Sequence, residues 1–378
     1  MSACLAPMPT DISIITTYRC QMRCQMCNIW KHPTDVKQEI TARELEILPN
    51  FRFVNITGGE PFQREDLEEI VEVMFRKSPR IVISTSGWHT ERILKLAQKY
   101  PHIGIRVSIE GLEKTNDRLR GREGGFQRGY GLLKTLKQMG VKDIGFGMTL
   151  SNLNHQDLIP LFELSKELGL EFATAAFHNS FYFHKGDNLI DQKQAVTADI
   201  EKLVNALLKE KHPKAWFRAF FNLGLINYIN GGRRMLPCEA GSANCFIEPY
   251  GDVYPCNGLE SQIWKQSMGN IREVKSFEEL WNSERAQQVR ARVRCCPKNC
   301  WMVGTAAPVM KKYVRHPASW VIKNKLKSLF GKPVCVADVP WYNVGQDPQQ
   351  GDLNLGRLKP FDDGTGVQPD KSLPLVED

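Results

Sequence analysis

From residue 11 to about 225, the chain alternates short apolar runs with amphipathic stretches. The apolar runs have the length and the β-branched content of strands that are buried on both faces. These strands are expected at 11–17, 53–57, 81–85, 103–109, 144–150 and 170–177. Apolar positions at helical spacing predict helices near 41–48, 64–77, 91–99, 126–139, 155–168 and 196–210. The alternation indicates an α/β fold, and six such units predict a partial (β/α)6 TIM-like barrel with a parallel sheet.

The pattern changes after the last expected helix. Residues 230–305 are rich in cysteine, and "CFIEPYGDVYPC" reads as two short strands around a Pro-Tyr-Gly-Asp turn. In "SFEELW", Ser276 and Glu279 have the spacing of a capping box that opens a helix. Further on, "KKYVRHPASWVIKNKLKSLFGK" predicts a basic amphipathic helix after Pro317. Beyond about residue 344 the chain is rich in Gly, Pro and Asp, which predicts a poorly ordered tail.

These changes in pattern divide the chain into five parts. We expect an N-terminal arm, a partial barrel, a small cysteine-rich α+β domain, a basic amphipathic extension and a disordered tail. Their expected bounds are 1–10, 11–228, 229–305, 306–343 and 344–378.

The net charge of +8 is concentrated in one segment, because 311–332 holds seven Lys or Arg and no acid. The rest of the chain is nearly neutral, which argues against a nucleic-acid-binding surface. The N-terminus lacks the features of a signal peptide, and no apolar run is long enough to span a membrane. We therefore expect a cytoplasmic protein, in which the eleven cysteines serve as metal ligands or catalytic groups rather than disulfides.

Three of these cysteines, Cys20, Cys24 and Cys27, lie in "TTYRCQMRCQMCNIW", just after the first expected strand. Ligands of parallel α/β sheets bind at this carboxyl end of the strands. Iron–sulfur clusters normally take four thiolates, so three would leave one iron open to a further ligand. Zinc prefers four closed ligands, and no second cysteine pair lies nearby. The spacing therefore favours an iron–sulfur cluster with an open position.

The loop resembles the C-x3-C-x-aromatic-C signature of radical S-adenosylmethionine (SAM) enzymes, with Met26 in the aromatic position. The resemblance implies a [4Fe–4S] cluster whose open iron chelates the amino and carboxylate groups of SAM. It also implies reductive cleavage of SAM to a 5′-deoxyadenosyl radical that abstracts hydrogen from a substrate.

Two segments extend the resemblance toward SAM. "TGGEP" is similar to the family's GGE motif, which implies that Gly58, Gly59 and Glu60 orient the SAM amine. Glycines allow a close backbone approach, and a carboxylate can pair with an ammonium group. "STSGW" follows the third expected strand, where Ser86 is either a SAM contact or a simple cap.

Two further segments suggest contacts to the other end of SAM. "VSIEG" resembles the family's SxDG segment, with Ser108 toward SAM and Glu110 in place of the commoner Asp. "RLRG" supplies Arg120, which is either a bidentate clamp for the SAM carboxylate or a surface arginine.

Seven cysteines follow a long gap: Cys238, Cys245, Cys256, Cys295, Cys296, Cys300 and Cys335. Their pattern resembles the C-terminal cluster domain called SPASM, or its shortened twitch form. Because "CCPKNCW" lacks one cysteine of the full motif, we expect the shortened form with one auxiliary [4Fe–4S] cluster. The implied ligands are Cys238, Cys256, Cys296 and Cys300. Cys245 and Cys295 are the reserve ligands, Cys335 is a candidate for a second cluster, and a zinc ribbon on the same thiols is the alternative.

The substrate is expected to be a small sugar or cell-envelope metabolite that is oxidised or epimerised. The auxiliary cluster would relay electrons, and a flavodoxin or ferredoxin would donate them. Substrate groups are expected in "FHNSFYFHKGD", where the candidates are His178, Asn179, Tyr182, His184 and Lys185. Its histidines would be general bases, while its aromatic residues are equally suited to packing.

Two other functions compete with this one. The second hypothesis is a maturase of ribosomally made peptides, which ranks lower because only 19 residues precede Cys20 and leave no peptide-recognition domain. The third is a zinc-dependent nucleic-acid-binding protein. For the basic segment 311–332, three readings stay open: a solvated face, a phosphate or sugar-nucleotide site, and a peripheral contact with an anionic membrane.

Overall fold

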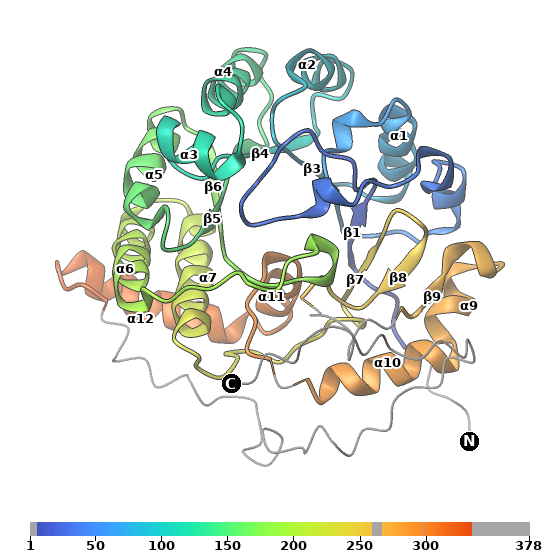
Figure 1. Ribbon diagram of the computed structural model, residues 1–378. Helices are drawn as coiled ribbons and strands as arrows, with labels where there is room; N and C mark the ends of the chain where they lie inside the picture. Colours follow the sequence, from blue (N-terminus) through green and yellow to red (C-terminus); the bar gives the residue numbers. More distant parts are fainter. Residues whose placement is uncertain (1–5, 259–266, 297, 335–378) are drawn as a thin grey trace.

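The computed structural model describes residues 6–258, 267–296 and 298–334. Its described strands form one sheet in the order β6-β5-β4-β3-β2-β1-β7-β8-β9. The first six are parallel and lie within a residue or two of the expected positions (Figure 1). They are β1 Asp11–Ile15, β2 Phe53–Thr57, β3 Ile81–Thr85, β4 Gly104–Ser108, β5 Ile144–Leu150 and β6 Glu171–Ala176. The predicted α/β fold with a partial parallel barrel is confirmed.

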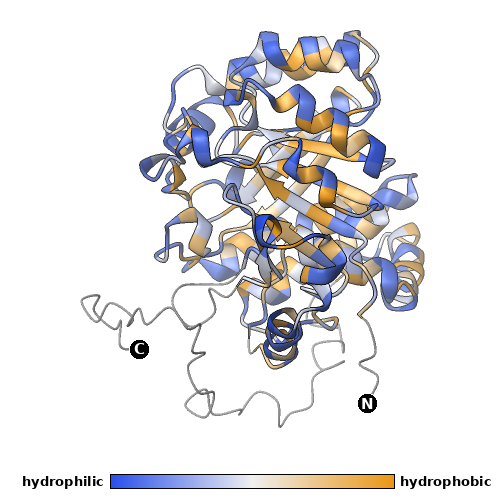
Figure 2. Ribbon diagram, turned by 90° about the vertical axis from the view of Figure 1, so that its right-hand side faces the viewer, coloured by the Kyte–Doolittle hydropathy of each residue, from blue (hydrophilic) through white to orange (hydrophobic). Residues whose placement is uncertain are grey.

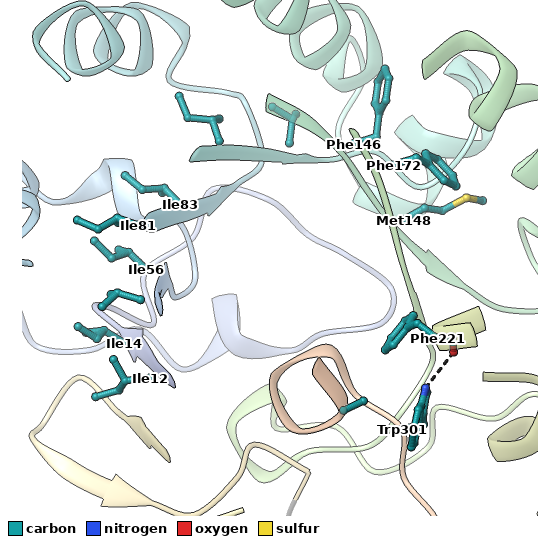
Figure 3. Packing of buried hydrophobic residues seen from close by; sticks show 14 of the residues in the cluster. Ile12, Ile14, Ile56, Ile81, Ile83, Phe146, Met148, Phe172, Phe221 and Trp301 are labelled. Carbon is teal, nitrogen blue, oxygen red and sulfur yellow. Dashed lines mark hydrogen bonds between the residues drawn. The ribbon is translucent and has the colours of Figure 1, made fainter. Parts of the chain in front are cut away.

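Alternate residues of these strands face two different environments. Ile12 and Ile14 of β1 and Ile56 of β2 are fully buried against the surrounding helices. Figure 3 shows them in one row with Ile81 and Ile83 of the neighbouring strand. The intervening polar side chains face the barrel interior instead, and Figure 2 shows the hydrophobic residues gathered on the strands and the inner helix faces.

Helices cover the outside of the curved sheet (Figure 1). They are α1 Leu67–Lys77, α2 Thr90–Lys99, α3 Glu113–Arg120, α4 Gly125–Gln138, α5 Leu158–Glu167, α6 Lys193–Lys209 and α7 Pro213–Ile229. The prediction of a helix at 41–48 is wrong, because only a 3-10 turn forms there, at Glu44–Ile47. Leu48 precedes a proline and is extended, with φ −66° and ψ 145°. The proline ring disfavours helical backbone at the preceding residue, so the turn cannot continue.

The predicted hairpin forms from β7 Asn244–Ile247 and β8 Asp252–Tyr254, which pair antiparallel. β8 also pairs with β9 Gly269–Asn270. β7 pairs parallel with β1, so the cysteine-rich segment continues the barrel sheet instead of forming a separate one. Two helices follow, α9 Phe277–Asn282 and α10 Glu284–Arg294. Ser276 caps α9 as predicted, since its hydroxyl accepts a hydrogen bond from the Glu279 N–H at 3.1 Å.

The basic extension forms two helices, α11 Val303–Lys312 and α12 Arg315–Leu329. α12 confirms the predicted basic helix, although it begins before Pro317, and it packs on α6 and α7 (Figure 1). α11 was not predicted and lies against β1 and β7. Among the described helices, none is both long and apolar enough to cross a membrane. The expected tail 344–378 and Cys335 lie outside the described residues.

Candidate functional site

The loop after β1 brings Cys20, Cys24 and Cys27 together. Burial, with a further contribution from the neighbouring Cys24, raises the pKa of the Cys20 and Cys27 thiols to about 12. The same burial raises the pKa of Cys24, against which Arg120 acts. Three thiols that influence one another in a low-dielectric site need a cationic partner to ionise together, and a metal cluster supplies one.

One side of this loop is held by the turn that follows β2. The Gly59 N–H donates to the Thr17 carbonyl at 2.6 Å, and the Glu60 N–H donates to the Arg19 carbonyl at 2.9 Å. A Cβ on Gly58 would lie 2.6 Å from the Thr17 carbonyl oxygen, and one on Gly59 would collide with the Arg19 carbonyl. Both glycines therefore allow the turn to pack directly on the backbone that leads into the cysteine loop.

The other side is held by the C-terminal end of α3. The Arg23 N–H donates to the Arg120 carbonyl at 3.1 Å, and the Gln25 N–H donates to the Leu119 carbonyl at 2.9 Å. Gly121 ends the helix with φ +64°, and a Cβ there would collide with the Arg23 carbonyl. The cysteine loop is thus clamped through its backbone on both sides, which fixes where its thiols lie.

Glu60 and Ser86 form one buried unit. Glu60 Oε1 accepts hydrogen bonds from the Thr85 hydroxyl at 2.7 Å and from the Phe62 N–H at 3.2 Å. Its Oε2 accepts from the Ser86 N–H at 2.7 Å and from the Ser86 hydroxyl at 2.5 Å. A carboxylate has about four acceptor positions, and these four bonds occupy them. The unit therefore ties β2 to β3, and its contact with SAM stays a prediction.

Arg120 lies beside the cysteine loop with only 11% of its side chain exposed, so it is not the surface arginine of the alternative interpretation. Its Nη1 lies 3.3 Å from Oε1 of Glu110. The other carboxylate oxygen of Glu110, Oε2, accepts a hydrogen bond from the Thr149 N–H at 2.6 Å. The buried Nε of Arg120 has no hydrogen-bond partner among the described residues. A buried cation with an unpaired donor beside three thiols fits an anionic group, such as a thiolate-ligated cluster or the SAM carboxylate. Ser108 lines the barrel interior on neighbouring β4.

The second cysteine set also comes together. Burial raises the pKa of Cys256, and Cys300, Cys238 and Cys296 raise it further. The four implied ligands are therefore electrostatic neighbours. Within the described ranges, no three His, Cys, Asp or Glu side chains are arranged to hold a single metal ion.

The reserve cysteines lie elsewhere. Cys245 is buried in β7, and burial alone raises its pKa, so no other thiol in the described part of the chain acts on it. Cys295 is exposed at the end of α10.

Arg234 is a residue of this second set that sequence reasoning missed. It is 2% exposed, and its Nη1 lies 4.0 Å from Cys300 Sγ and also donates to the Cys300 carbonyl. Trp301, which follows Cys300 in the sequence, donates a hydrogen bond from its indole nitrogen to the Phe221 carbonyl at 2.9 Å (Figure 3). A Cβ on Gly224 would collide with that indole. The only hint in the sequence was the arginine pair in "GGRRMLPC", just before Cys238.

A segment after β6, residues 177–190, connects the two cysteine sets, and we call it the strap. Near the first set, the Phe183 carbonyl accepts the Asn28 N–H at 2.8 Å. Near the second, the Ser180 hydroxyl donates to the carbonyl of Asn257 at 2.5 Å. Tyr182 is buried between them; burial and then Cys27 raise its pKa.

The strap also covers a cavity of about 490 Å³ inside the barrel. One part of its wall carries the polar and aromatic side chains of Ser84, Ser108, Thr149, His178, Tyr182, Cys256, Asn257 and Trp301. Another part carries charged side chains: Asp11, Arg80, Arg106, Lys214, Arg218 and Lys311. The predicted substrate residues therefore separate, since His178 and Tyr182 line the cavity whereas His184 stacks on His32 at 4.0 Å.

Two family models match the regions that carry these sites. Residues 14–165 match the radical SAM superfamily, and residues 238–301 match SPASM, an iron–sulfur cluster-binding domain. The first match contains the cysteine triad, and the second contains the four clustered thiols.

Individual proteins resemble the chain over most of its length. The chain is 26% identical to Fe-coproporphyrin III synthase of Methanosarcina barkeri over 306 residues, which cover 70% of this chain and 71% of that protein. It is 24% identical to the antilisterial bacteriocin subtilosin biosynthesis protein AlbA of Bacillus subtilis over 311 residues, 78% of this chain and 65% of that protein.

The fold is similar to that of Streptococcus suis SuiB bound to SAM. The TM-score is 0.57 at 17% identity, over 76% of this chain and 68% of that one. Because the radical SAM model and the SPASM model both match, the chain belongs to the radical SAM superfamily, as an enzyme that uses a [4Fe–4S] cluster and SAM and carries a C-terminal SPASM domain for auxiliary iron–sulfur clusters.

Proposed function

We propose that this enzyme modifies a peptide, by removing hydrogen from one residue so that a new bond can form. The observation that carries the proposal is the cavity under the strap, which is lined by residues next to both cysteine sets. AlbA, a relative by sequence, is a protein of bacteriocin biosynthesis. The same fold holds the precursor peptide SuiA in SuiB. The sequence led us to expect a small sugar or cell-envelope metabolite as substrate, but none of the proteins named here has a name that refers to such a substrate.

The two cysteine sets suit the two electrons of such an oxidation. When bound, a cluster held by Cys20, Cys24 and Cys27 would supply the electron for cleavage of SAM, and the SAM-derived radical would take one hydrogen atom from the substrate. A cluster held by Cys238, Cys256, Cys296 and Cys300 would accept the second electron of the substrate, and a base would take the proton as the new bond closes. His178 lines the cavity and has the chemistry of that base. Tyr182, between Cys27 and Asn257, would position the substrate.

A tetrapyrrole is the second candidate, because of the charged part of the cavity. Arg80, Arg106, Lys214, Arg218 and Lys311 supply five cations there, facing Asp11 inside the cavity. Asp143 pairs with two of the arginines, and Glu171 pairs with both Lys214 and Arg218. Carboxylate side chains of a porphyrin would suit the remaining positive charge. Fe-coproporphyrin III synthase is a relative that aligns over 70% of this chain and 71% of its own.

The test is an anaerobic assay with the reconstituted enzyme, SAM and dithionite. Peptides encoded by short reading frames beside the gene are compared with coproporphyrin as substrates. The peptide proposal expects faster 5′-deoxyadenosine formation and a peptide that has lost two hydrogens, both reduced at least tenfold by His178→Ala. If coproporphyrin stimulates 5′-deoxyadenosine formation and the peptides do not, the substrate is a tetrapyrrole and the peptide proposal is wrong. A Cys24→Ala variant controls for cleavage without the first cluster.

A further inference from the structure

The outer face of α12 is apolar and exposed. Ile322, Leu326, Leu329 and Phe330 are 63%, 52%, 69% and 80% exposed. Their spacing of four, three and one residues places them on one side of the helix. Among the described residues, five of the eleven exposed large hydrophobics lie between Val314 and Phe330. Apolar residues scattered singly over a surface need no explanation, but a continuous stripe of this kind marks an interaction site.

The opposite face of the same helix accounts for its fixed position. Trp320, Val321 and Asn324 are buried, and α12 packs on both α6 and α7 (Figure 1). Lys325 adds two hydrogen bonds to this contact, from its Nζ to the carbonyls of Leu208 at 2.5 Å and Glu210 at 2.8 Å. The exposed stripe is therefore presented by a helix that is already anchored, so it remains available to something outside the barrel.

The charge around the stripe identifies the kind of partner. Lys323 and Lys327 lie on the same helix, and Arg315 and Lys332 lie at its two ends. The whole segment 311–332 carries seven Lys or Arg and no acid. Apolar side chains flanked by lysines fit the boundary between the headgroups and acyl chains of an anionic lipid surface. A soluble acidic protein would match the charge but would not need four bulky apolar residues in one stripe.

We propose that α12 docks this enzyme on an anionic membrane surface, with Ile322, Leu326, Leu329 and Phe330 inserted and the lysines at the headgroups. This inference does not rest on the identity of the substrate, because none of the stripe residues lines the cavity. It places the protein on the membrane as a peripheral partner, which agrees with the absence of a spanning helix among the described residues.

The experiment is sedimentation of the full-length, cluster-loaded enzyme with phosphatidylcholine vesicles that contain or lack phosphatidylserine. We expect binding only to the anionic vesicles, weakened by salt. Ile322→Ser/Leu329→Ser/Phe330→Ser should reduce binding at least tenfold. Lys323→Gln and Lys327→Gln should each reduce it about fivefold. The matched control is Val36→Ser/Met139→Ser, which removes two exposed apolar residues outside the stripe and should bind like the wild type.

Three results would overturn the proposal. One is a wild-type protein that stays in solution with anionic vesicles. Another is a triple serine variant that binds as well as the wild type while circular dichroism shows both to be folded. The third is self-association in solution that the triple variant abolishes without any vesicle binding, which would assign the face to a second copy of the chain.

Discussion

The two cysteine sets reach the same kind of arrangement by different physical routes. Cys20, Cys24 and Cys27 share one loop, and backbone hydrogen bonds from the turn after β2 and from α3 clamp that loop. Cys238, Cys256, Cys296 and Cys300 come from separate segments, which side chains such as Arg234 and Trp301 hold together. The thiols of the first set are therefore neighbours in sequence whose loop is positioned by backbone contacts, whereas those of the second set are brought together from separate segments by side-chain packing.

The largest expected effect comes from removing each set in turn. Cys20/Cys24/Cys27→Ala should abolish SAM cleavage and lower the iron content from about eight to about four per chain. Cys256/Cys300→Ala should lower iron by the same amount but keep SAM cleavage, while product formation is lost. Iron analysis and 5′-deoxyadenosine assays of the anaerobic proteins measure both. About twelve irons in the wild type would mean a second auxiliary cluster and a wrong ligand set.

A smaller change tests whether the backbone clamp positions the first set. Gly59→Ala introduces a Cβ against the Arg19 carbonyl and should lower SAM cleavage on the order of a hundredfold, with the iron of the second set retained. The control is Gly131→Ala in α4, where a Cβ meets no atom within 4 Å. That variant should cleave SAM at the wild-type rate. Equal activities of the two variants would show that the clamp is dispensable.

In the second set, Arg234 should act on redox potential more than on assembly. A buried guanidinium near Cys300 stabilises the more negative, reduced cluster. Arg234→Gln should lower the midpoint potential of the auxiliary cluster on the order of 50 mV, the equivalent of about 1 kcal/mol for one electron. Redox titration followed by electron paramagnetic resonance measures it. Arg234→Lys keeps the charge and should recover most of the shift, whereas loss of iron in both variants would indicate a purely structural role.

The smallest effect is expected on the stability of the fold, from the Asp143 ion pairs, which involve neither cysteine set. Burial raises the pKa of Asp143, but Arg106 and Arg80 outweigh it and lower the value to about 2. The carboxylate therefore stabilises the fold at neutral pH, and this contribution is lost as the pH falls from about 4 toward 2. Asp143→Asn should lower the free energy of unfolding by about 1 to 2 kcal/mol at pH 7 and by much less near pH 2. Denaturant unfolding of the cluster-free protein measures this; an equal cost at both pH values would contradict the ion pairs.

The sequence revealed the elements that have a clear local pattern and missed those that lack one. The six parallel strands were predicted because each is a continuous apolar run between turns. α7 was missed because it is buried on several sides and has no polar face to give a period. α3 was missed for the opposite reason, since "EKTNDRLR" is almost entirely polar. The parallel pairing of β7 with β1 joins residues more than 200 positions apart, and no local pattern encodes that.

The same division holds for the site. Motif spacing led to the residues of the cysteine loop and to the neighbouring glycines, which the structure brings together. Spacing could not separate the grouped Cys238 and Cys256 from Cys245, which differs from them only in its strand position. Arg234 carries no motif, so its place beside Cys300 appears only once the chain is folded.

The joining of β7 to β1 has a consequence for electron tunnelling. β8 runs antiparallel to both strands. Cys256, which follows β8, therefore comes after the opposite end of the strands from the end that leads to Cys20. The length of these paired strands therefore contributes to the separation between the two cysteine sets. Tunnelling rates fall steeply with distance, and here the distance is fixed by hydrogen-bonded strands instead of a hinge between domains. We therefore expect that electron transfer between clusters held at the two sites would have a rate set by the barrel sheet, which would stay the same whichever substrate enters.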